Sequence, residues 1–378
     1  MKHLIVDRDT SDHGLWHMGA QDTEASARIF ARKNSNGDTT PYYRYMDTAT
    51  SSLAPFKPEL IEELVHVTDN EPMNPLVCMN KGHLLAQLTF FIGPVNFYCT
   101  VRGERQCKPM NTGDSCLITS YVPHSFTSRD PSQYAAIVAI TFSGNVRDAL
   151  GDLVHHDIAQ VVAHAGNRRE PSTVFVRRVE RFAELRGTSP AALAAALAAP
   201  PHACDAAAVA RTLRGKEVDA AVVAALAAHL NVPASEFECP ELEAWEEVTY
   251  AKTPDDASET ESKMYAFASC KHTPDTGGYE WYLKGTETRT SQFFNYIYNH
   301  GEAHVMIAWN GRKRTVAPGD SVVLKPFVEA KFSSMSGKMA KLVVVKVPGC
   351  VNQGVMKECS TFAAEGLQRM SENTTKWW

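Results

Sequence analysis

Hydrophobic and polar residues alternate in short runs from Pro41 to about Val146. Runs such as HLLAQLTFFIG, VNFYCTVRG and YAAIVAITF are rich in β-branched and aromatic residues, and turn sequences such as Gly-Asp, Asn-Thr-Gly and Asp-Pro separate them. This pattern predicts an all-β barrel or sandwich. A similar texture returns from about Tyr250 to Pro348, in GGYEWYLKG, HVMIAWNG and AKLVVVKV, and predicts a second β part.

The segment between the two β parts has a helical period. From about Thr173 to Phe237, alanine- and leucine-rich stretches predict short helices, with Ser189 and Asp219 as N-caps. The predicted class is therefore α+β. We place an N-terminal segment at 1–40, a first β domain at 41–150, a helical domain at 151–245, a second β domain at 246–350 and a tail at 351–378.

The two β parts carry a related motif. The first contains Asn80-x-Gly82-His83 and then GDSCLITSYVPH, in which His124 stands ten residues beyond Asp114. The second contains Asn299-x-Gly301-Glu302 and then GDSVVLKPFVEA, in which Ala330 stands ten residues beyond Asp320. This internal repeat predicts two related barrels, and only the first has histidines at both places.

The composition argues against several classes of protein. The chain has 378 residues, 44% hydrophobic and 21% charged, with a net charge of -5 and a pI near 6.3, which argues against a general polyanion binder. No run approaches the roughly 20 apolar residues of a membrane span. Nine cysteines without a CxxC pair suit a reducing compartment. We expect a cytoplasmic protein with no membrane and no nucleic acid among its partners.

The stretch MNKGHLLAQLTFF holds two polar side chains, His83 and Gln87, in an apolar run. Positions four apart on a strand share a face, and inward positions of neighbouring strands converge in a small barrel. His83, Gln87 and His124 could therefore present two imidazoles and one amide oxygen to a metal. The alternative is that they are core or rim residues bonded to the backbone. His300 and His304 of the second part are not expected to bind metal.

The motif NKGH, the spacing to GDS-x8-H, the paired β parts and the helices between them resemble the non-haem iron phosphonate dioxygenases, a cupin family. The resemblance spans about Pro41 to Pro348. It implies two cupin-type barrels, the second degenerate, with a small helix-turn-helix-like domain between them, one Fe(II), and oxidative cleavage of 2-hydroxyethylphosphonate by O2. Homo-oligomerisation stays open.

The resemblance also implies the third metal ligand. One branch of the family has a glutamate six residues before the second histidine, where this chain has Ile118. The other branch has a glutamine four residues after the first histidine, where Gln87 stands. The ligand set implied is His83, Gln87 and His124, with Gln87 also influencing the reaction. The second branch releases methylphosphonate and carbon dioxide or bicarbonate, and the first releases hydroxymethylphosphonate and formate.

Several residues are implied to bind the phosphonate. Tyr45 and Asn80 align with tyrosine and asparagine positions that contact it in the resembling enzymes, and Tyr45 is expected to act in catalysis as well. The alternatives are a core tyrosine and a turn asparagine. The basic group is assigned to Lys33, next to Arg32, or to Arg186, which precedes Gly187 where relatives carry a lysine.

Two other classes remain as alternatives. The ending ALAAHLNVPASEF resembles repressor-type helix-turn-helix domains, so a cupin-type transcription regulator is conceivable. The stretch SPAALAAALAA, however, offers no Arg, Asn or Gln to read bases or contact phosphates. A metal-independent sugar or acid isomerase on the same fold is the third reading.

Overall fold

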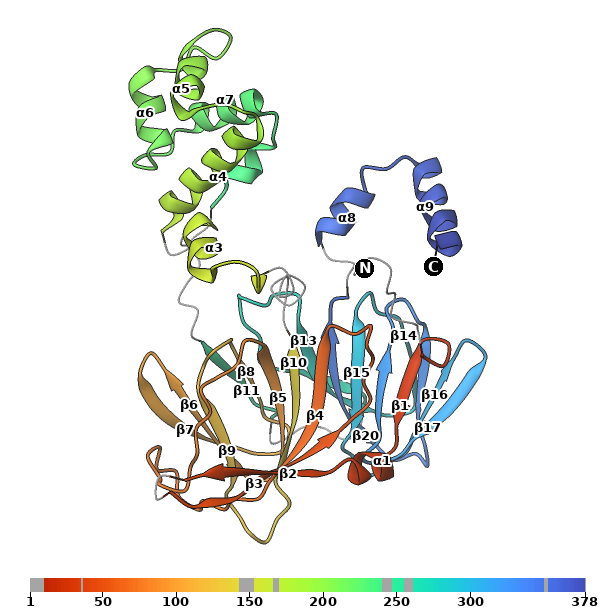
Figure 1. Cartoon of the computed structure of the whole chain (residues 1–378). Helices are drawn as coiled ribbons and strands as arrows, with labels where there is room; N and C mark the ends of the chain where they lie inside the picture. Colours follow the sequence, from red (N-terminus) through yellow and green to blue (C-terminus); the bar gives the residue numbers. More distant parts are fainter. Residues whose placement is uncertain are drawn as a thin grey trace. The chain divides into compact units, whose positions relative to one another are not determined.

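The computed structural model describes residues 10–34, 37–142, 153–165, 170–239, 247–254, 261–349 and 353–377 (Figure 1). The chain divides into two compact units. One unit combines Met1–Gly144 with Glu246–Trp378 and contains both β parts, and the other is the helical stretch Asn145–Trp245. The structure thus confirms a chain of mixed α and β content, and it adds elements in the N-terminal segment and the tail, where the sequence predicted none.

The first β part consists of two sheets around an apolar interior. The seven-stranded sheet has the order β11-β8-β5-β10-β4-β3-β2, and the three-stranded sheet has the order β7-β6-β9. Aromatic side chains such as Phe91, Phe97 and Phe126 fill the space enclosed. The strands are β2 Arg28–Lys33, β3 Thr39–Asp47, β4 Phe56–Glu63, β5 Ala86–Ile92, β6 Val95–Val101, β7 Glu104–Met110, β8 Ser115–Ile118, β9 His124–Ser128, β10 Ala136–Phe142 and β11 Val248–Ala251.

The second β part repeats this plan with a six-stranded and a four-stranded sheet. Their orders are β1-β18-β15-β20-β13-β12 and β14-β19-β16-β17. The strands are β1 Leu15–Met18, β12 Lys263–Ala266, β13 Gly277–Leu283, β14 Thr286–Arg289, β15 Phe294–Asn299, β16 Val305–Trp309, β17 Arg312–Val316, β18 Ser321–Leu324, β19 Ala330–Ser334 and β20 Ala340–Val347. Both parts are pairs of sheets with antiparallel neighbours.

The Gly-Asp-Ser turns of the repeat have the same geometry in both parts. Asp114 accepts a hydrogen bond from the Asn111 amide, and Asp320 accepts one from the Ala317 amide, each at 2.9 Å. The glycines before them have φ of +95° and +83°, a conformation that glycine adopts without strain. β8 and β18 end four residues after Asp114 and Asp320, and β9 and β19 begin at His124 and Ala330. The repeat seen in the sequence is therefore also a repeat in structure.

Two strands join the sheet of the other β part. β1 pairs with β18 although it precedes the first β part, and β11 pairs with β8 although it follows the helical unit. The short helix α1, Ala20–Ala25, leads from β1 to β2. This exchange ties the two β parts together by backbone hydrogen bonds.

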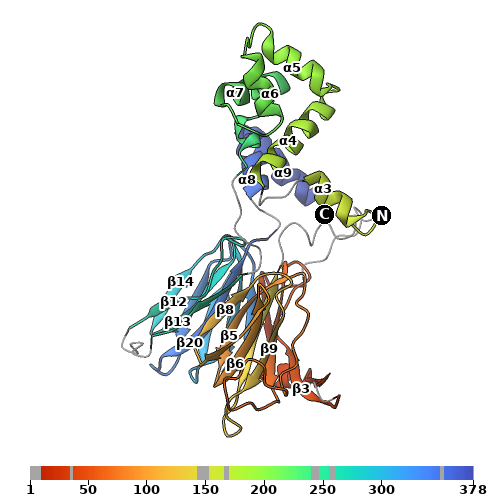
Figure 2. The ribbon, with the colours of Figure 1, turned by 90° about the vertical axis from the view of Figure 1, so that its left-hand side faces the viewer.

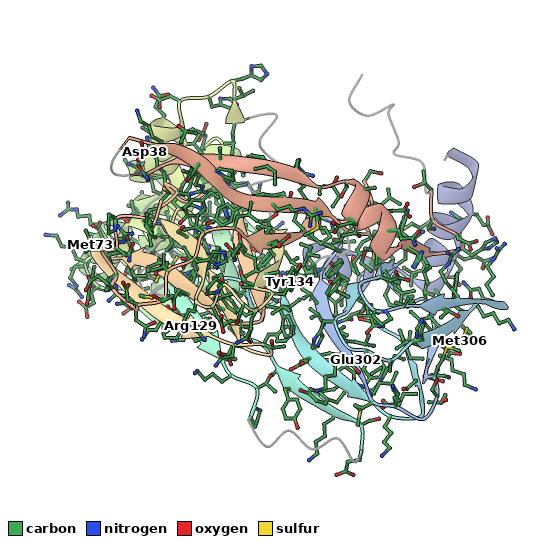
Figure 3. All side chains as sticks on the ribbon, turned by 90° about the horizontal axis from the view of Figure 1, so that it is seen from below. Asp38, Met73, Arg129, Tyr134, Glu302 and Met306 are labelled. Atoms are coloured by element: carbon green, nitrogen blue, oxygen red, sulfur yellow. The ribbon has the colours of Figure 1, made fainter. Side chains whose placement is uncertain are left out.

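A shared core lies between the two β parts. Leu88 and Phe90 on β5 pack in one cluster with Tyr296 and Val343 of the second part, and side chains fill the space between the sheets (Figure 3). Each such buried side chain contributes about 1.5–3 kcal/mol relative to exposure. Alternate residues of a strand point to opposite faces. Because Leu88 and Phe90 face the shared core, Gln87 and the residues two and four positions after it point into the interior of the first β part.

The helical unit has its own core. Ser189 accepts a hydrogen bond from the Ala192 amide, and Asp219 accepts bonds from the Ala221 and Val222 amides, which confirms both predicted N-caps. The stretch SPAALAAALAA forms α5 and buries Leu193 and Leu197. The helices are α3 Ile158–Ala165, α4 Pro171–Leu185, α5 Pro190–Ala198, α6 Ala206–Leu213, α7 Ala220–Leu230 and the 3-10 helix η2 Ala234–Phe237.

The C-terminal segment forms α8, Gln353–Cys359, and α9, Ala364–Trp377. Among the described helices, none combines the length and the apolar character that crossing a bilayer requires.

Candidate functional site

Gln87 and Ile118 are direct partners on neighbouring strands that point into the first β part. β5 and β8 lie side by side in Figure 2, and their register pairs these two residues. Gln87 is 4% exposed and Ile118 1%. Because directly opposed residues have Cβ atoms roughly 4.5–5.5 Å apart, a side chain at 118 reaches the same space as one at 87.

The two histidines lie beside Gln87 on chain segments other than β5. His83 lies in the loop before β5, and His124 begins β9. Their rings are 5.1 Å apart, centroid to centroid, and nearly perpendicular. His83 Nδ1 lies 2.6 Å from the Leu85 carbonyl and His124 Nδ1 lies 2.8 Å from the Val122 carbonyl, so each Nδ1 carries the hydrogen. Each Nε2 therefore keeps a lone pair for a ligand.

The Gln87 amide presents its oxygen to His83. Its Nε2 donates to Thr89 Oγ1 at 2.9 Å, which leaves Oε1 at 3.3 Å from His83 Nε2. Two acceptors then face each other with no hydrogen between them. A cation between the two atoms would satisfy both, so the donor set fits a metal ion better than it fits a closed hydrogen-bond network.

The amide is needed to complete such a site. Among the described residues, no group of three or more histidine, cysteine or acidic side chains is placed to hold a metal. Two imidazoles and one amide oxygen suit a first-row ion such as Fe(II), and they leave coordination positions for other ligands. An amide adds no negative charge, so the ion would present a larger positive charge to an anionic substrate than a carboxylate-ligated ion.

Burial keeps His124 neutral. Desolvation lowers the pKa of His124 to about 4, the hydrogen bond to the Val122 carbonyl opposes this shift, and the charges of His83 and Arg32 add to it. The imidazole lone pair is consequently available at neutral pH.

Asn80 and Gly82 hold the turn that carries His83. Asn80 Oδ1 accepts hydrogen bonds from the Gly82 and His124 amides, both at 2.8 Å. Asn80 Nδ2 donates to His124 Nε2 at 2.9 Å, and a metal ion on Nε2 would replace this bond and free Nδ2 as a donor inside the site. Gly82 has φ of +74°, and a Cβ there would lie 2.4 Å from the Tyr121 carbonyl carbon. Only glycine fits this turn.

Of the neighbouring cations on β2, Arg32 faces the interior and Lys33 faces solvent. The Arg32 guanidinium lies 4.9 Å from the centre of the Tyr43 ring, and its Nη1 donates to the Cys78 carbonyl at 2.9 Å. Lys33 is exposed. Tyr45 is half-buried on the same face of β3 as Tyr43, and burial raises its pKa to about 12, so its hydroxyl stays protonated.

Arg186 belongs to the helical unit. Its Nε donates to the Leu230 carbonyl at 2.9 Å, so the structure gives it a role within that unit's own packing.

The second β part presents a different set at the repeated positions. Glu302, labelled in Figure 3, is exposed, and Ala330 is buried in an apolar cluster. His300 Nε2 lies 3.0 Å from an oxygen of the buried Glu280 carboxyl group. No metal ligand pair corresponding to His83 and His124 is present at these positions.

The sequence analysis did not identify several buried polar side chains in the interior of the first β part. Tyr42 and Tyr43 both hydrogen-bond Ser125 Oγ, at 2.9 and 3.1 Å. Glu63, directly opposite Tyr43 on β4, is 3% exposed. The alternation of β4, which puts Glu63 on the face of the apolar Ile61, is the signal that could have revealed a buried acid.

Comparisons with known proteins show what the whole chain is similar to. The chain is 30% identical to a protein named methylphosphonate synthase from Nitrosopumilus maritimus, over 99% of this chain and 82% of that protein. The structure of Streptomyces albus hydroxyethylphosphonate dioxygenase, with 2-hydroxyethylphosphonate and Fe(II) bound, superposes with a TM-score of 0.79 at 28% identity, covering 98% of this chain and 84% of that one. A hydroxyethylphosphonate dioxygenase variant, 17% identical, shares the fold with a TM-score of 0.73 and coverage of 97% and 87%. No protein-family model matches the sequence.

Fold and site together define a non-haem iron dioxygenase of phosphonate metabolism. The chain belongs to the methylphosphonate synthase family.

Proposed function

We propose that the protein binds one Fe(II) through His83, Gln87 and His124 and uses O2 to cleave the carbon-carbon bond of 2-hydroxyethylphosphonate, releasing methylphosphonate and carbon dioxide or bicarbonate. The observation that carries this proposal is the orientation of the Gln87 amide, whose oxygen faces a histidine lone pair 3.3 Å away. Ile118 opposite it cannot supply the carboxylate of the other branch. The bound iron would supply the activation of O2.

The chain's own residues would bind and orient the substrate. Arg32 brings a positive charge to the interior, and Asn80 Nδ2 and the Tyr45 hydroxyl are donors for phosphonate oxygens. Arg32 is therefore our choice for the phosphonate-binding cation. Lys33, one residue further and exposed, and Arg186, bonded within the helical unit, are weaker candidates.

The choice between products distinguishes the two branches of the family. After bond cleavage, the phosphonate-bearing carbon can end as a methyl group or gain a hydroxyl. The neutral third ligand and the 30% identical relative named methylphosphonate synthase both support the methyl outcome. Hydroxymethylphosphonate with formate is the alternative product pair, which a carboxylate third ligand would favour.

The test combines metal analysis with phosphorus NMR. Purified protein should contain one iron per chain after anaerobic loading, and aerobic incubation with 2-hydroxyethylphosphonate should yield methylphosphonate as the main phosphorus product. Hydroxymethylphosphonate with stoichiometric formate would place the protein in the other branch. An iron-loaded protein that leaves the substrate unchanged under these conditions would refute the function.

We further propose that both β parts are cupin-type barrels, the second degenerate, with the boundaries 41–150 and 246–350, and that the helices of 151–245 form a helix-turn-helix-like unit that packs and does not read DNA. The shared geometry of the two Gly-Asp-Ser turns supports the first point, and the apolar α5 supports the second. A cytoplasmic location is supported by the free thiols of all eight described cysteines.

A further inference from the structure

Glu63 is a buried acid with no partner for its side chain. It is the last residue of β4, it is 3% exposed, and its amide donates to the Ala135 carbonyl at 3.0 Å. Within the part of the chain that the structure describes, neither carboxyl oxygen has a hydrogen-bond partner. Leaving a buried polar group unpaired is unfavourable, so such a group requires an explanation beyond packing.

The groups that face Glu63 are three tyrosines and one cation. Tyr43 opposes it directly on β3, and Tyr42 and Tyr45 flank Tyr43. Arg32 on β2 covers the Tyr43 ring. On its own strand Glu62 points away, to Arg44. On the other side, β10 offers only apolar residues from Ala136 to Ile140.

Burial raises the pKa of Glu63 well above its usual range, the positive charge of Arg32 opposes this shift, and Glu62 adds to it. Burial therefore favours the neutral carboxyl of Glu63 over the ionised one more strongly than in an exposed glutamate. Arg32 Nη1 donates to the Cys78 carbonyl at 2.9 Å, and within the described part of the chain Arg32 forms no ion pair, so no described carboxylate neutralises its charge.

We infer that Glu63 is a positioning residue that controls how much of the Arg32 charge is available to the anionic substrate. With a neutral carboxyl beneath Tyr43, Arg32 attracts a phosphonate dianion at full strength. When the carboxyl ionises, the two anions compete for one cation and phosphonate binding weakens. Binding of the dianion and protonation of Glu63 are then coupled. This inference rests on the proposed function, in which Arg32 binds the phosphonate.

The test measures phosphonate binding as a function of pH with Glu63→Gln, which keeps the side-chain shape and cannot ionise. Iron-loaded protein is titrated anaerobically with 2-hydroxyethylphosphonate by calorimetry, in buffers of different ionisation enthalpy. Wild type should lose affinity on the alkaline side, by up to about tenfold per pH unit above the pKa of Glu63, and should take up a proton on binding there. Glu63→Gln should keep wild-type affinity near neutral pH and lose both effects.

Glu62→Gln is the matched control, because it makes the same change one residue earlier on the opposite face of β4, where the carboxylate binds Arg44 at 3.0 Å. It should keep an alkaline loss of affinity and proton uptake, displaced slightly to lower pH because Glu62 adds to the raised pKa of Glu63. Ionisation of the substrate itself affects all three proteins equally. A Glu63→Gln profile that superimposes on wild type would overturn the inference. Failure of wild type to bind the phosphonate at neutral pH would instead refute the proposed function.

A second measurement covers a variant that does not fold. Infrared spectroscopy of wild type should show the carbonyl band of a protonated carboxylic acid that disappears at alkaline pH. Adding the phosphonate at that pH should restore the band. A band that does not return when the phosphonate is added would contradict the coupling between phosphonate binding and protonation of Glu63.

Discussion

Moving the third metal ligand from β5 to β8 is the sharpest test of the ligand set. Because Gln87 and Ile118 are directly opposed, the double change Gln87→Ala with Ile118→Glu should rebuild a site with two histidines and a carboxylate at the same place. We expect the variant to bind Fe(II) and to shift its products toward hydroxymethylphosphonate.

The magnitude follows from the burial of Ile118. Its side chain is 1% exposed, so its replacement removes roughly 1.5–3 kcal/mol of apolar burial. An unpaired buried carboxyl adds about 1–3 kcal/mol. The metal-free variant should therefore be less stable than wild type by about 2.5–6 kcal/mol. Fe(II) at a hundredfold excess over its dissociation constant should return ~2.7 kcal/mol.

Urea unfolding with and without Fe(II), followed by phosphorus NMR of the products, measures both effects. Gln87→Ala alone is the control without a third ligand and should gain less stability from iron. Gln87→Ala with Ile118→Gln is the control for charge, because it places an amide at the same point and should keep methylphosphonate as its product. If iron stabilises the carboxylate variant no more than Gln87→Ala, residue 118 does not reach the metal and the ligand geometry inferred here is wrong.

The remaining predictions concern single residues. His124→Ala should abolish iron binding by metal analysis, whereas His300→Ala should keep its iron and lose about 0.5–3 kcal/mol of stability in urea, because a largely buried side chain that packs on Phe90 is removed. Arg32→Met should raise KM at least about tenfold, the loss expected for one charge-assisted contact, and the exposed Lys33→Met should leave KM near wild type in steady-state assays. Glu63→Gln should gain stability over wild type as pH rises, by up to about 1.4 kcal/mol per pH unit, because the raised folded pKa makes wild type lose stability above the usual glutamate pKa. Parallel unfolding curves at pH 5 and 8 would contradict this.

Local pattern predicted most of the secondary structure. The alternation around MNKGHLLAQLTFF put Gln87 on the face opposite Leu88, and the N-caps Ser189 and Asp219 marked where α5 and α7 begin. These features depend on neighbouring residues in the chain, so a single sequence contains them. The repeat of the Gly-Asp-Ser turn was visible for the same reason.

The exchange of β1 and β11 between the β parts could not be predicted in this way. A strand's periodicity indicates which face is buried and does not indicate which strand it pairs with. Leu15–Met18 and Val248–Ala251 are compatible with several sheet edges, and the shared core of the two parts selects among them.

The sequence by itself determined the kinds of element, the internal repeat and the candidate ligands His83, Gln87 and His124, because short-range period and motif spacing carry this information. Only the tertiary structure decided that Arg32, and not Lys33, faces the tyrosines, and that Glu63 is buried without a partner. These facts depend on contacts between β2, β3 and β4, whose side chains meet only when the sheet has formed. Charge and burial at the site are properties of that packing, so they cannot be assigned from residues taken one strand at a time.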